Sequence, residues 1–213
     1  GASDITGSHL AYAVDAKLYE NWSDRNGILR AHPDVVADSE TIGSLTYREA
    51  RELAYSGAKI LHQDTLLPLI SKGIPLNVRN TKNPAHPGTY VGPEKHQNGH
   101  VVEGIAHMND FAVIYLEKMG IEDEVGYLSR VTEIFAQHGL SIERVADSND
   151  SLALIVEQDK GRNRNKIEEI ARQIRDAGLV DAEVNVQYNK GLICVVGEGM
   201  RHTPGVLARV SNA

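Results

Sequence analysis

The most regular stretch of this chain is residues 126–135, which run Gly-Tyr-Leu-Ser-Arg-Val-Thr-Glu-Ile-Phe. Its apolar side chains recur at the spacing of one helix face: Leu128, Val131, Ile134 and Phe135. Gly139 follows where a glycine commonly ends a helix. The stretch therefore predicts an amphipathic helix that packs on one side.

The segments around this helix predict a small α+β unit. In chain order they are strands over 111–117, 140–146, 152–157 and 182–186, with a second amphipathic helix over 167–174 before the last strand. A polar turn at 148–150 joins the second and third strands. The order is β-α-β-β-α-β, the ferredoxin-like split unit.

An internal repeat follows this unit. Residues 126–131, Gly-Tyr-Leu-Ser-Arg-Val, return 79 positions later as Gly-Val-Leu-Ala-Arg-Val at 205–210. Residues 189–213 therefore resemble the start of a second such unit, of which only eight residues follow Gly205. We expect on this ground that the chain is a fragment or lacks its C-terminus. Its first residues lie in a small-residue turn with no strand before it, which gives the same expectation for the N-terminus.

The first hundred residues have a different, α/β pattern. A helix is expected over 47–61, where Thr46 with Glu49 three positions on forms a capping-box pattern. A short helix over 66–70 and strands over 17–20 and 74–79 alternate with it. The Pro- and Gly-rich run 80–104 predicts a linker.

Composition excludes several classes of protein. The 213 residues have a net charge of −7, which argues against bulk nucleic-acid binding. No apolar run approaches the length of a membrane span, and no secretion signal is visible, so we expect a cytoplasmic protein. A single cysteine, Cys194, excludes an intramolecular disulfide and is expected to be a buried strand thiol.

Some short motifs could bind ligands, each with a plainer alternative. The small-residue turn at 1–7 offers backbone N–H groups and hydroxyls to an anion, or is an ordinary capped loop. Residues 21–27 follow a strand, where ligands bind in α/β sheets, or form a plain turn. Lys59, on a helix of small residues, reaches a phosphate or is a solvated edge. His96 and His100 lack a third ligand, so no metal site is expected.

The acidic cluster 122–124 before the first repeat helix also has two interpretations. It is a solvated loop, or it pairs with the ammonium group of a ligand that arrives near Gly126.

The order of these motifs resembles that of aspartokinases. The stretches that carry the resemblance are Gly-Ala-Ser-Asp-Ile-Thr at 1–6, Tyr-Glu-Asn-Trp-Ser-Asp at 19–24, Leu-Thr-Tyr-Arg-Glu-Ala at 45–50, Gly-Ala-Lys-Ile-Leu-His at 57–62, Ile-Pro-Leu at 74–76, Asn-Thr-Lys-Asn-Pro at 80–84, Pro-Gly-Thr at 87–89 and Gly-Glu-Gly-Met at 197–200. The resemblance covers essentially the whole chain, in order.

The resemblance implies an amino-acid-kinase domain followed by tandem ACT domains of βαββαβ form. Aspartokinases use ATP with Mg to phosphorylate the β-carboxylate of L-aspartate, which opens lysine, threonine and methionine synthesis. The boundaries it implies are 1–93 for the C-terminal part of the kinase domain, 94–110 for a linker and a first strand of open ownership, 111–188 for the first ACT domain, and 189–213 for the truncated second.

The resemblance also implies roles for residues of the kinase domain. Ser3 matches the serine that contacts aspartate, and Asp4 the acid beside it. Ser23 and Asp24 match the Thr-Asp pair near the nucleotide, and Lys59 matches the lysine that reaches the ATP phosphates. This chain departs from the pattern in two places. Leu29 stands for a tyrosine near the adenine, and Asp34 stands for a phosphate-contacting arginine.

For the regulatory half, the resemblance implies an amino-acid effector site shared between two subunits. The matching residues are Glu124, Gly126, Tyr127, Leu128, Ile142, Glu143 and Ser148. Backbone N–H groups at the helix start suit an α-carboxylate, and the two glutamates suit ammonium groups. Two acids favour lysine over threonine as the effector, and a homodimer through the ACT domains is expected by analogy.

The resemblance also implies which activity this chain is expected to have by itself. The family's opening Lys-Phe-Gly-Gly motif and aspartate-binding acid are absent, so no catalysis by this fragment and no tightly bound cofactor are expected. Two other functions remain open: a stand-alone amino-acid-sensing ACT module, and another amino-acid kinase, such as one acting on glutamate derivatives. The Gly-Ala-Lys helix argues against the first, and the 79-residue repeat against the second.

Overall fold

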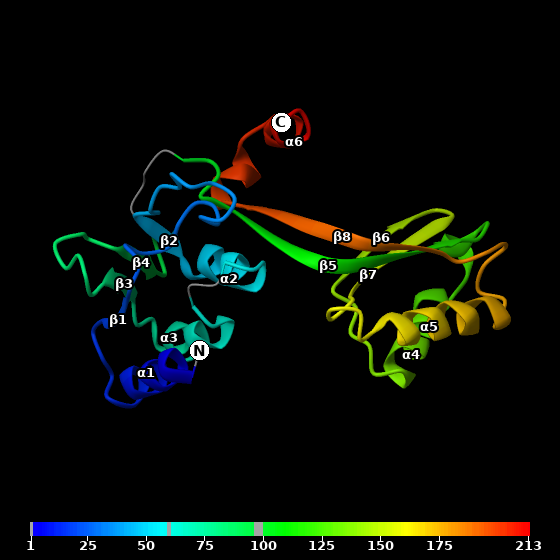
Figure 1. Ribbon diagram of the computed structural model, residues 1–213, viewed down its shortest axis with the longest axis horizontal. Helices are drawn as coiled ribbons and strands as arrows, with labels where there is room; N and C mark the ends of the chain where they lie inside the picture. The colour runs from blue at the N-terminus through cyan, green and yellow to red at the C-terminus, as the bar shows by residue number, and fades with distance from the viewer. Residues whose placement is uncertain (1, 59–60, 96–99) are drawn as a thin grey trace. The chain divides into compact units, whose positions relative to one another are not determined.

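The structure, a computed structural model, describes residues 2–58, 61–95 and 100–213. Its elements divide between a first unit, residues 1–108 with 193–213, and a second unit, residues 109–192 (Figure 1). Strands β5 (Gly104–Glu117) and β8 (Asn185–Val196) each have residues in both units. Each unit has its own hydrophobic core.

A four-stranded mixed sheet forms the centre of the first unit, in the order β1-β3-β4-β2. Its strands are β1 (Tyr19–Ser23), β2 (Ser44–Thr46), β3 (Leu76–Asn80) and β4 (Thr89–Gly92). β1 runs parallel to β3, and β2 runs parallel to β4, whereas β3 and β4 are antiparallel. Burial alternates along β3, because successive side chains of a strand point to opposite faces.

The helices of the first unit are α1 (Ala2–Ala13), α2 (Tyr47–Tyr55), α3 (Leu66–Lys72) and α6 (Val206–Ser211), with 3₁₀ turns at Gln63–Thr65 and Glu198–His202. The predicted capping box of α2 is confirmed: Thr46 accepts a hydrogen bond from the Glu49 N–H, and Glu49 accepts one from the Thr46 N–H. The predicted end of this helix at Leu61 is wrong. The chain leaves the helix at Gly57, whose φ of +99° is a left-handed conformation that a glycine tolerates.

Two other predictions for this unit are wrong. The turn predicted at 1–7 is helical from Ala2, with Asp4 in the first turn, where a negative charge favours the helix. The predicted linker 80–104 contains β4, which pairs with both β2 and β3. Its short Thr-Tyr-Val-Gly run is stabilised by these distant partners, which no local pattern reveals.

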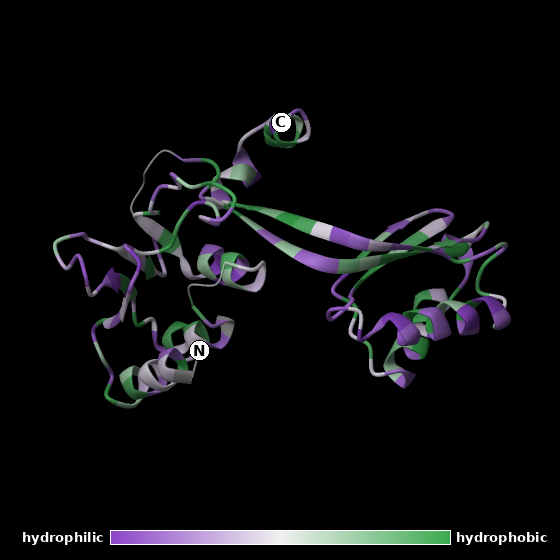
Figure 2. Cartoon of the chain, viewed as in Figure 1, coloured by the Kyte–Doolittle hydropathy of each residue, from purple (hydrophilic) through white to green (hydrophobic). Residues whose placement is uncertain are grey.

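The second unit has the predicted β-α-β-β-α-β order. After β5 come a 3₁₀ turn at Ile121–Asp123, α4 (Tyr127–Gln137), β6 (Arg144–Ser148), β7 (Ser151–Glu157), α5 (Arg164–Asp176) and then β8. The sheet order is β6-β7-β5-β8, with β7 antiparallel to both β5 and β6. Both helices have an apolar side and a polar side (Figure 2), and their apolar residues are buried in the core of this unit.

The last strand differs from the prediction. A strand was expected over 182–186 and a separate one around Cys194, but β8 is continuous from Asn185 to Val196. Asn189 takes a φ of +56° within it, and its N–H contacts the Gln158 side chain at 3.4 Å. Cys194 lies in β8 and is half-buried rather than fully buried.

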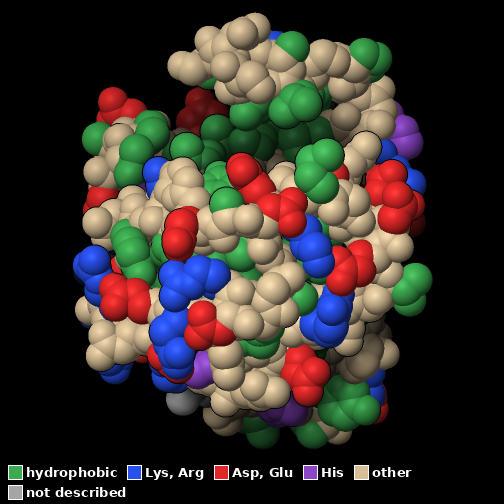
Figure 3. Space-filling view, turned by 90° about the vertical axis from the view of Figure 1, so that its right-hand side faces the viewer, with side chains coloured by type: hydrophobic (Ala, Val, Ile, Leu, Met, Phe, Trp, Pro, Cys, Tyr) green, Lys and Arg blue, Asp and Glu red, His purple; other side chains and the backbone are tan. Residues whose placement is uncertain are grey.

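Charges of both signs are mixed on the face of the molecule that Figure 3 shows. Figure 3 shows acidic and basic side chains interspersed over the face in view, with no large region of one sign. Among the residues that the structure describes, no helix combines the length and the apolar character that crossing a membrane requires.

Candidate functional site

The parallel strands β1 and β3 end side by side, with Ser23 opposite Asn80. Carboxyl ends of parallel strands are where ligands bind in α/β sheets. Asp24 and Arg25 come directly after β1, so their side chains lie at this edge. The strand expected over 17–20 is found at Tyr19–Ser23, so of the stretch 21–27 only residues 24–27 follow it.

The loop after β1 is fixed by the loop after β3. Thr81 donates to the Ser23 carbonyl through both its N–H and its hydroxyl, each at 2.9 Å. The Asn80 side-chain amide donates to Asn26 Oδ1 at 2.8 Å. These bonds join segments more than 50 residues apart, and they hold the end of β1 in one position.

A buried threonine directs the chain from this loop toward the core. Thr89 Oγ1 accepts from the Ile28 N–H at 2.8 Å and donates to the Ile42 carbonyl at 2.6 Å. Gly27, just before, has a φ of +123°, and a Cβ added to it would lie 2.4 Å from Thr89 Oγ1. Only a glycine fits this approach, and the turn leads Leu29 into the cavity described next.

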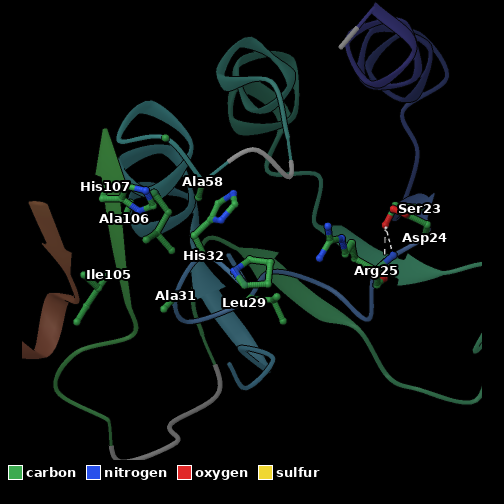
Figure 4. Close-up of a pocket in the computed structure, with 13 residues that line it drawn as sticks. Ser23, Asp24, Arg25, Leu29, Ala31, His32, Ala58, Ile105, Ala106 and His107 are labelled. Atoms are coloured by element: carbon green, nitrogen blue, oxygen red, sulfur yellow. Dashed lines mark hydrogen bonds between the residues drawn. The ribbon is translucent and has the colours of Figure 1, made fainter. Parts of the chain in front are cut away.

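A cavity of about 230 Å³ opens beside the end of β1 (Figure 4). It is lined by Ser23, Asp24, Arg25, Leu29, Ala31, His32, Pro33, Leu53, Gly57, Ala58, Ile105, Ala106 and His107. The leucine, isoleucine and alanine side chains give it an apolar part, and the residues after β1 give it a polar end. The rings of His32 and His107 meet edge to face, with centroids 5.6 Å apart. We call this cavity the β1 pocket.

The structure brings two of the three predicted nucleotide residues to the β1 pocket. Ser23 and Asp24 line it, and Ser23 Oγ accepts from the Arg25 N–H at 3.1 Å. Lys59 lies outside the described residues, although its neighbour Ala58 lines the pocket.

The two residues that depart from the family pattern, Leu29 and Asp34, lie at different places relative to the β1 pocket. Leu29 lines the β1 pocket, whereas Asp34 does not. The Asp34 N–H instead donates to His32 Nδ1 at 3.2 Å.

Three polar residues of the pocket were missed from the sequence. Arg25 stands directly beside the predicted Ser-Asp pair, so its position after β1 was an available signal. His32 lies two residues before Asp34, one of the two positions that depart from the family pattern. His107 comes from β5, which no local pattern connects to β1.

The two residues predicted to lie at the substrate aspartate are elsewhere in the first unit. Ser3 and Asp4 are in the first turn of α1, with Ser3 Oγ 3.4 Å from Asp4 Oδ1, and neither lines the β1 pocket. The Tyr19 hydroxyl donates to the Asp4 carbonyl at 3.3 Å, which ties α1 to β1. Burial raises the pKa of Tyr19, and the negative charge of Asp4 adds to the increase.

In the second unit, Glu124 is already paired with two cations. Its carboxylate accepts from Lys118 Nζ at 2.6 Å and from the Arg130 guanidinium. Hydrogen bonds from Lys118 and then from Arg130 lower the pKa of Glu124. A ligand ammonium at this carboxylate therefore has to compete with both.

The next three predicted effector residues lie at the start of α4. Gly126 is the N-cap, with a φ of +79°. The Tyr127 side chain is buried, and its hydroxyl donates to the Leu179 carbonyl at 2.6 Å, while Leu128 is about half exposed. The backbone N–H groups of this helix start are the groups that suit a carboxylate.

The remaining effector residues are spread along β6 and the segment before it. Ser148 pairs in register with Ser151, which pairs with Glu117, so it lies at the Lys118 end of the sheet. Ile142 packs partly against the core, and the Glu143 N–H donates to the Ile155 carbonyl at 2.8 Å. Five residues of strand span about 16 Å, so one chain does not bring Glu143 and Glu124 together.

The surroundings of Ser148 include a second cavity, of about 480 Å³. It is lined by Glu117, Lys118, Met119, Ser148, Asn149, Asp150, Ser151, Asp181 and Ala182. Elsewhere, His96 lies outside the described residues, and the described residues contain no group of three or more His, Cys, Asp or Glu side chains that could hold a metal ion.

Comparisons with known proteins point in one direction. A family model described as the amino acid kinase family matches residues 1–80. Aspartokinase 3 of Bacillus subtilis is 38% identical over 99% of this chain and 46% of its own length. The aspartate kinase of Clostridium acetobutylicum has a solved structure that is 35% identical, with a TM-score of 0.90, covering 99% of this chain and 48% of that one.

Escherichia coli aspartokinase III is similar in two solved states. Its complex with aspartate and ADP is 27% identical, with a TM-score of 0.78, covering 100% of this chain and 47% of that one. Its complex with lysine and aspartate is 29% identical, with a TM-score of 0.71, and the match covers 92% of this chain and 43% of that one. The chain spans somewhat less than half the length of each of these relatives. Over nearly all of its own length it is similar, in sequence and in fold, to aspartokinases.

Proposed function

We propose that this chain is part of an aspartate kinase, which transfers the γ-phosphoryl group of ATP to the β-carboxylate of L-aspartate. The main support is the β1 pocket, which places Ser23 and Asp24 beside an apolar cavity at the carboxyl end of a parallel strand. Similarity to aspartokinases over 99% of the chain gives the reaction class. The activity itself belongs to the whole protein, of which this chain matches about half.

The residues present fit a nucleotide with its metal ion. The apolar side chains of the β1 pocket suit the flat face of a base, and about 230 Å³ accommodates a base while the phosphates extend outward. Mg²⁺ is commonly bound by one or two carboxylates together with substrate phosphates, and Asp24 supplies one carboxylate at the polar end. Phosphoryl transfer depends mainly on positioning and charge neutralisation. The apolar side chains of the β1 pocket would position the base, and a metal ion held by Asp24 would neutralise phosphate charge.

Ser3 and Asp4 are the residues we assign to aspartate. Their support is their position in the first turn of α1, since the backbone N–H groups at a helix start favour an anionic ligand. Tyr19 fixes this turn on β1, the strand that also ends in Ser23. We therefore propose that β1 links the two substrate sites.

The second unit is proposed to be an ACT regulatory domain with lysine as its feedback effector. Its β-α-β-β-α-β order and the helix start at Gly126 support the assignment. E. coli aspartokinase III, which is similar to this chain, has been solved with lysine. Residues 189–213, with their repeat of the 126–131 pattern, are proposed to begin a second domain of the same kind.

A second copy of the chain is proposed to complete the effector site. All five residues of β6 are exposed, and this strand lies at the edge of its sheet. Because Glu143 and Glu124 are far apart in one chain, a site that uses both needs β6 from another copy. A homodimer through this unit meets that requirement.

Two measurements test these proposals. An NMR titration of the chain with Mg-ATP should perturb amides around the β1 pocket, and Asp24→Asn should weaken the response while the exposed control Asp38→Asn leaves it unchanged.

Lysine should raise the melting temperature of the chain, since a ligand at 100 times its Kd adds about 2.7 kcal/mol to the free energy of unfolding. Glu143→Ala should abolish the lysine effect, and the exposed control Glu133→Ala should retain it. Stabilisation by threonine alone would contradict the choice of lysine.

A further inference from the structure

One cationic side chain stands at the polar end of the β1 pocket. Among the described residues that line the pocket, Arg25 is the only lysine or arginine. Its backbone is fixed on both sides, because its N–H donates to Ser23 Oγ at 3.1 Å and its carbonyl lies 3.4 Å from the same oxygen. Figure 4 shows its side chain extending from the end of β1 toward His32.

The Arg25 guanidinium has no ion pair or hydrogen bond within the described part of the chain, and its side chain is exposed. The two neighbouring arginines differ from it. Arg30 donates to the Glu103 carbonyl at 3.0 Å, and Arg79 pairs with Glu20 at 3.1 Å. Both are engaged in interactions that hold the fold together, whereas Arg25 is available to a ligand.

The chemistry of the ligand follows from these surroundings. A guanidinium presents parallel N–H donors that match two oxygens of one phosphate group. The apolar side chains of the pocket offer nothing to a phosphate and suit the base, so the phosphates are expected at the Arg25 end. Asp24 beside it repels a bare phosphate, and a cation at this position has to offset that charge.

We propose that Arg25 recognises the phosphates of the nucleotide, beside any contribution of Lys59, which lies outside the described residues. This inference rests on the proposed nucleotide site and adds to it a contact that distinguishes a nucleoside triphosphate from a nucleoside. Arg25 binds the phosphates directly and takes no part in proton transfer.

The test compares ATP and adenosine as ligands of the 213-residue chain, with Mg²⁺ held constant. Affinities come from NMR titrations, which measure weak binding. Arg25→Gln should weaken ATP binding about tenfold, the size expected for one charge-assisted contact, and change adenosine binding less than twofold. Arg25→Lys, which keeps the charge but loses the planar fork, should lie in between. The control is Arg51→Gln, an exposed arginine on α2 that does not line the pocket.

The outcomes separate this inference from the proposed function. If the unaltered chain binds neither ligand, the nucleotide site itself is wrong, and this inference is overturned with it. If the unaltered chain binds both, but Arg25→Gln weakens ATP and adenosine equally or changes neither, the nucleotide site stands and the role of Arg25 is wrong. A selective loss of ATP affinity, with the Arg51 variant unchanged, supports the inference.

Discussion

Replacing Glu49 by alanine is expected to destabilise the first unit by about 3–5 kcal/mol. The Glu49 carboxylate is 1% exposed and accepts three hydrogen bonds. These come from Lys95 Nζ at 2.7 Å, from the Glu198 N–H at 2.8 Å and from the Thr46 N–H at 3.0 Å. Lys95 also contacts Glu103, whose carboxylate is fully buried, at 2.9 Å.

The magnitude follows from what the substitution leaves behind. Loss of the capping interaction with Thr46 costs about 1 kcal/mol. An unpaired buried N–H at Glu198 costs about 1–3 kcal/mol, and Lys95 loses one of its two carboxylates. These losses share one side chain and are not additive, so the expected sum stays within the range for breaking a buried ion pair.

Urea unfolding followed by tryptophan fluorescence measures the loss of stability in the first unit. Trp22, the single tryptophan, lies in β1, so its fluorescence reports on the first unit. Glu52→Ala is the matched control, because Glu52 lies on the same helix with an exposed side chain. If Glu49→Ala lowers the free energy of unfolding no more than Glu52→Ala does, the reasoning about the buried charges of Glu49, Lys95 and Glu103 is refuted.

The same carboxylate predicts a pH dependence. Burial opposes ionisation of Glu49, but the hydrogen bonds from Lys95, Glu198 and Thr46 outweigh it and lower its pKa below the ordinary 4.5. A depressed folded-state pKa adds stability above the unfolded-state pKa and loses it as pH falls. The free energy of unfolding should therefore decrease below about pH 4.5. Glu49→Gln should flatten this decrease, and an unchanged slope would contradict the assignment.

Three further substitutions test other parts of the structure. Gly27→Ala should lower the melting temperature clearly, since φ is +123° and the new Cβ would meet Thr89 Oγ1; a wild-type melting temperature would contradict this. Tyr127→Phe should cost about 1–2 kcal/mol in urea unfolding, because a buried carbonyl loses its donor; no loss would show that the hydroxyl is dispensable. Lys118→Met should raise the pKa of Glu124 toward its ordinary value in an NMR titration, and an unchanged pKa would show that Lys118 does not pair with it.

Features set by neighbouring residues could be predicted from the sequence. The capping box of Thr46 and Glu49 was predictable because both partners lie within one helical turn. The helix start at Gly126 was predictable from the glycine and the apolar spacing after it, and the same pattern marks Gly205, which has a φ of +80°.

Features set by distant partners could not be predicted. β4 is stabilised by β2 and β3, so its sequence alone resembles a linker. A domain boundary is expected between residues 188 and 189, yet β8 continues through this position, where Gln158 contacts Asn189. The β1 pocket was half predictable: Ser23 and Asp24 follow a strand, whereas His107 reaches the pocket only because β5 passes beside it.

The central claim is that a nucleotide binds in the β1 pocket. Photo-crosslinking of the chain with 8-azido-ATP and Mg²⁺, followed by mass spectrometry of the peptides, tests it most directly. The account predicts labelling of peptides that contain residues 23–33 or 105–107, suppressed by excess ATP. Labelling confined to residues 109–192, or labelling that ATP does not suppress, would contradict it.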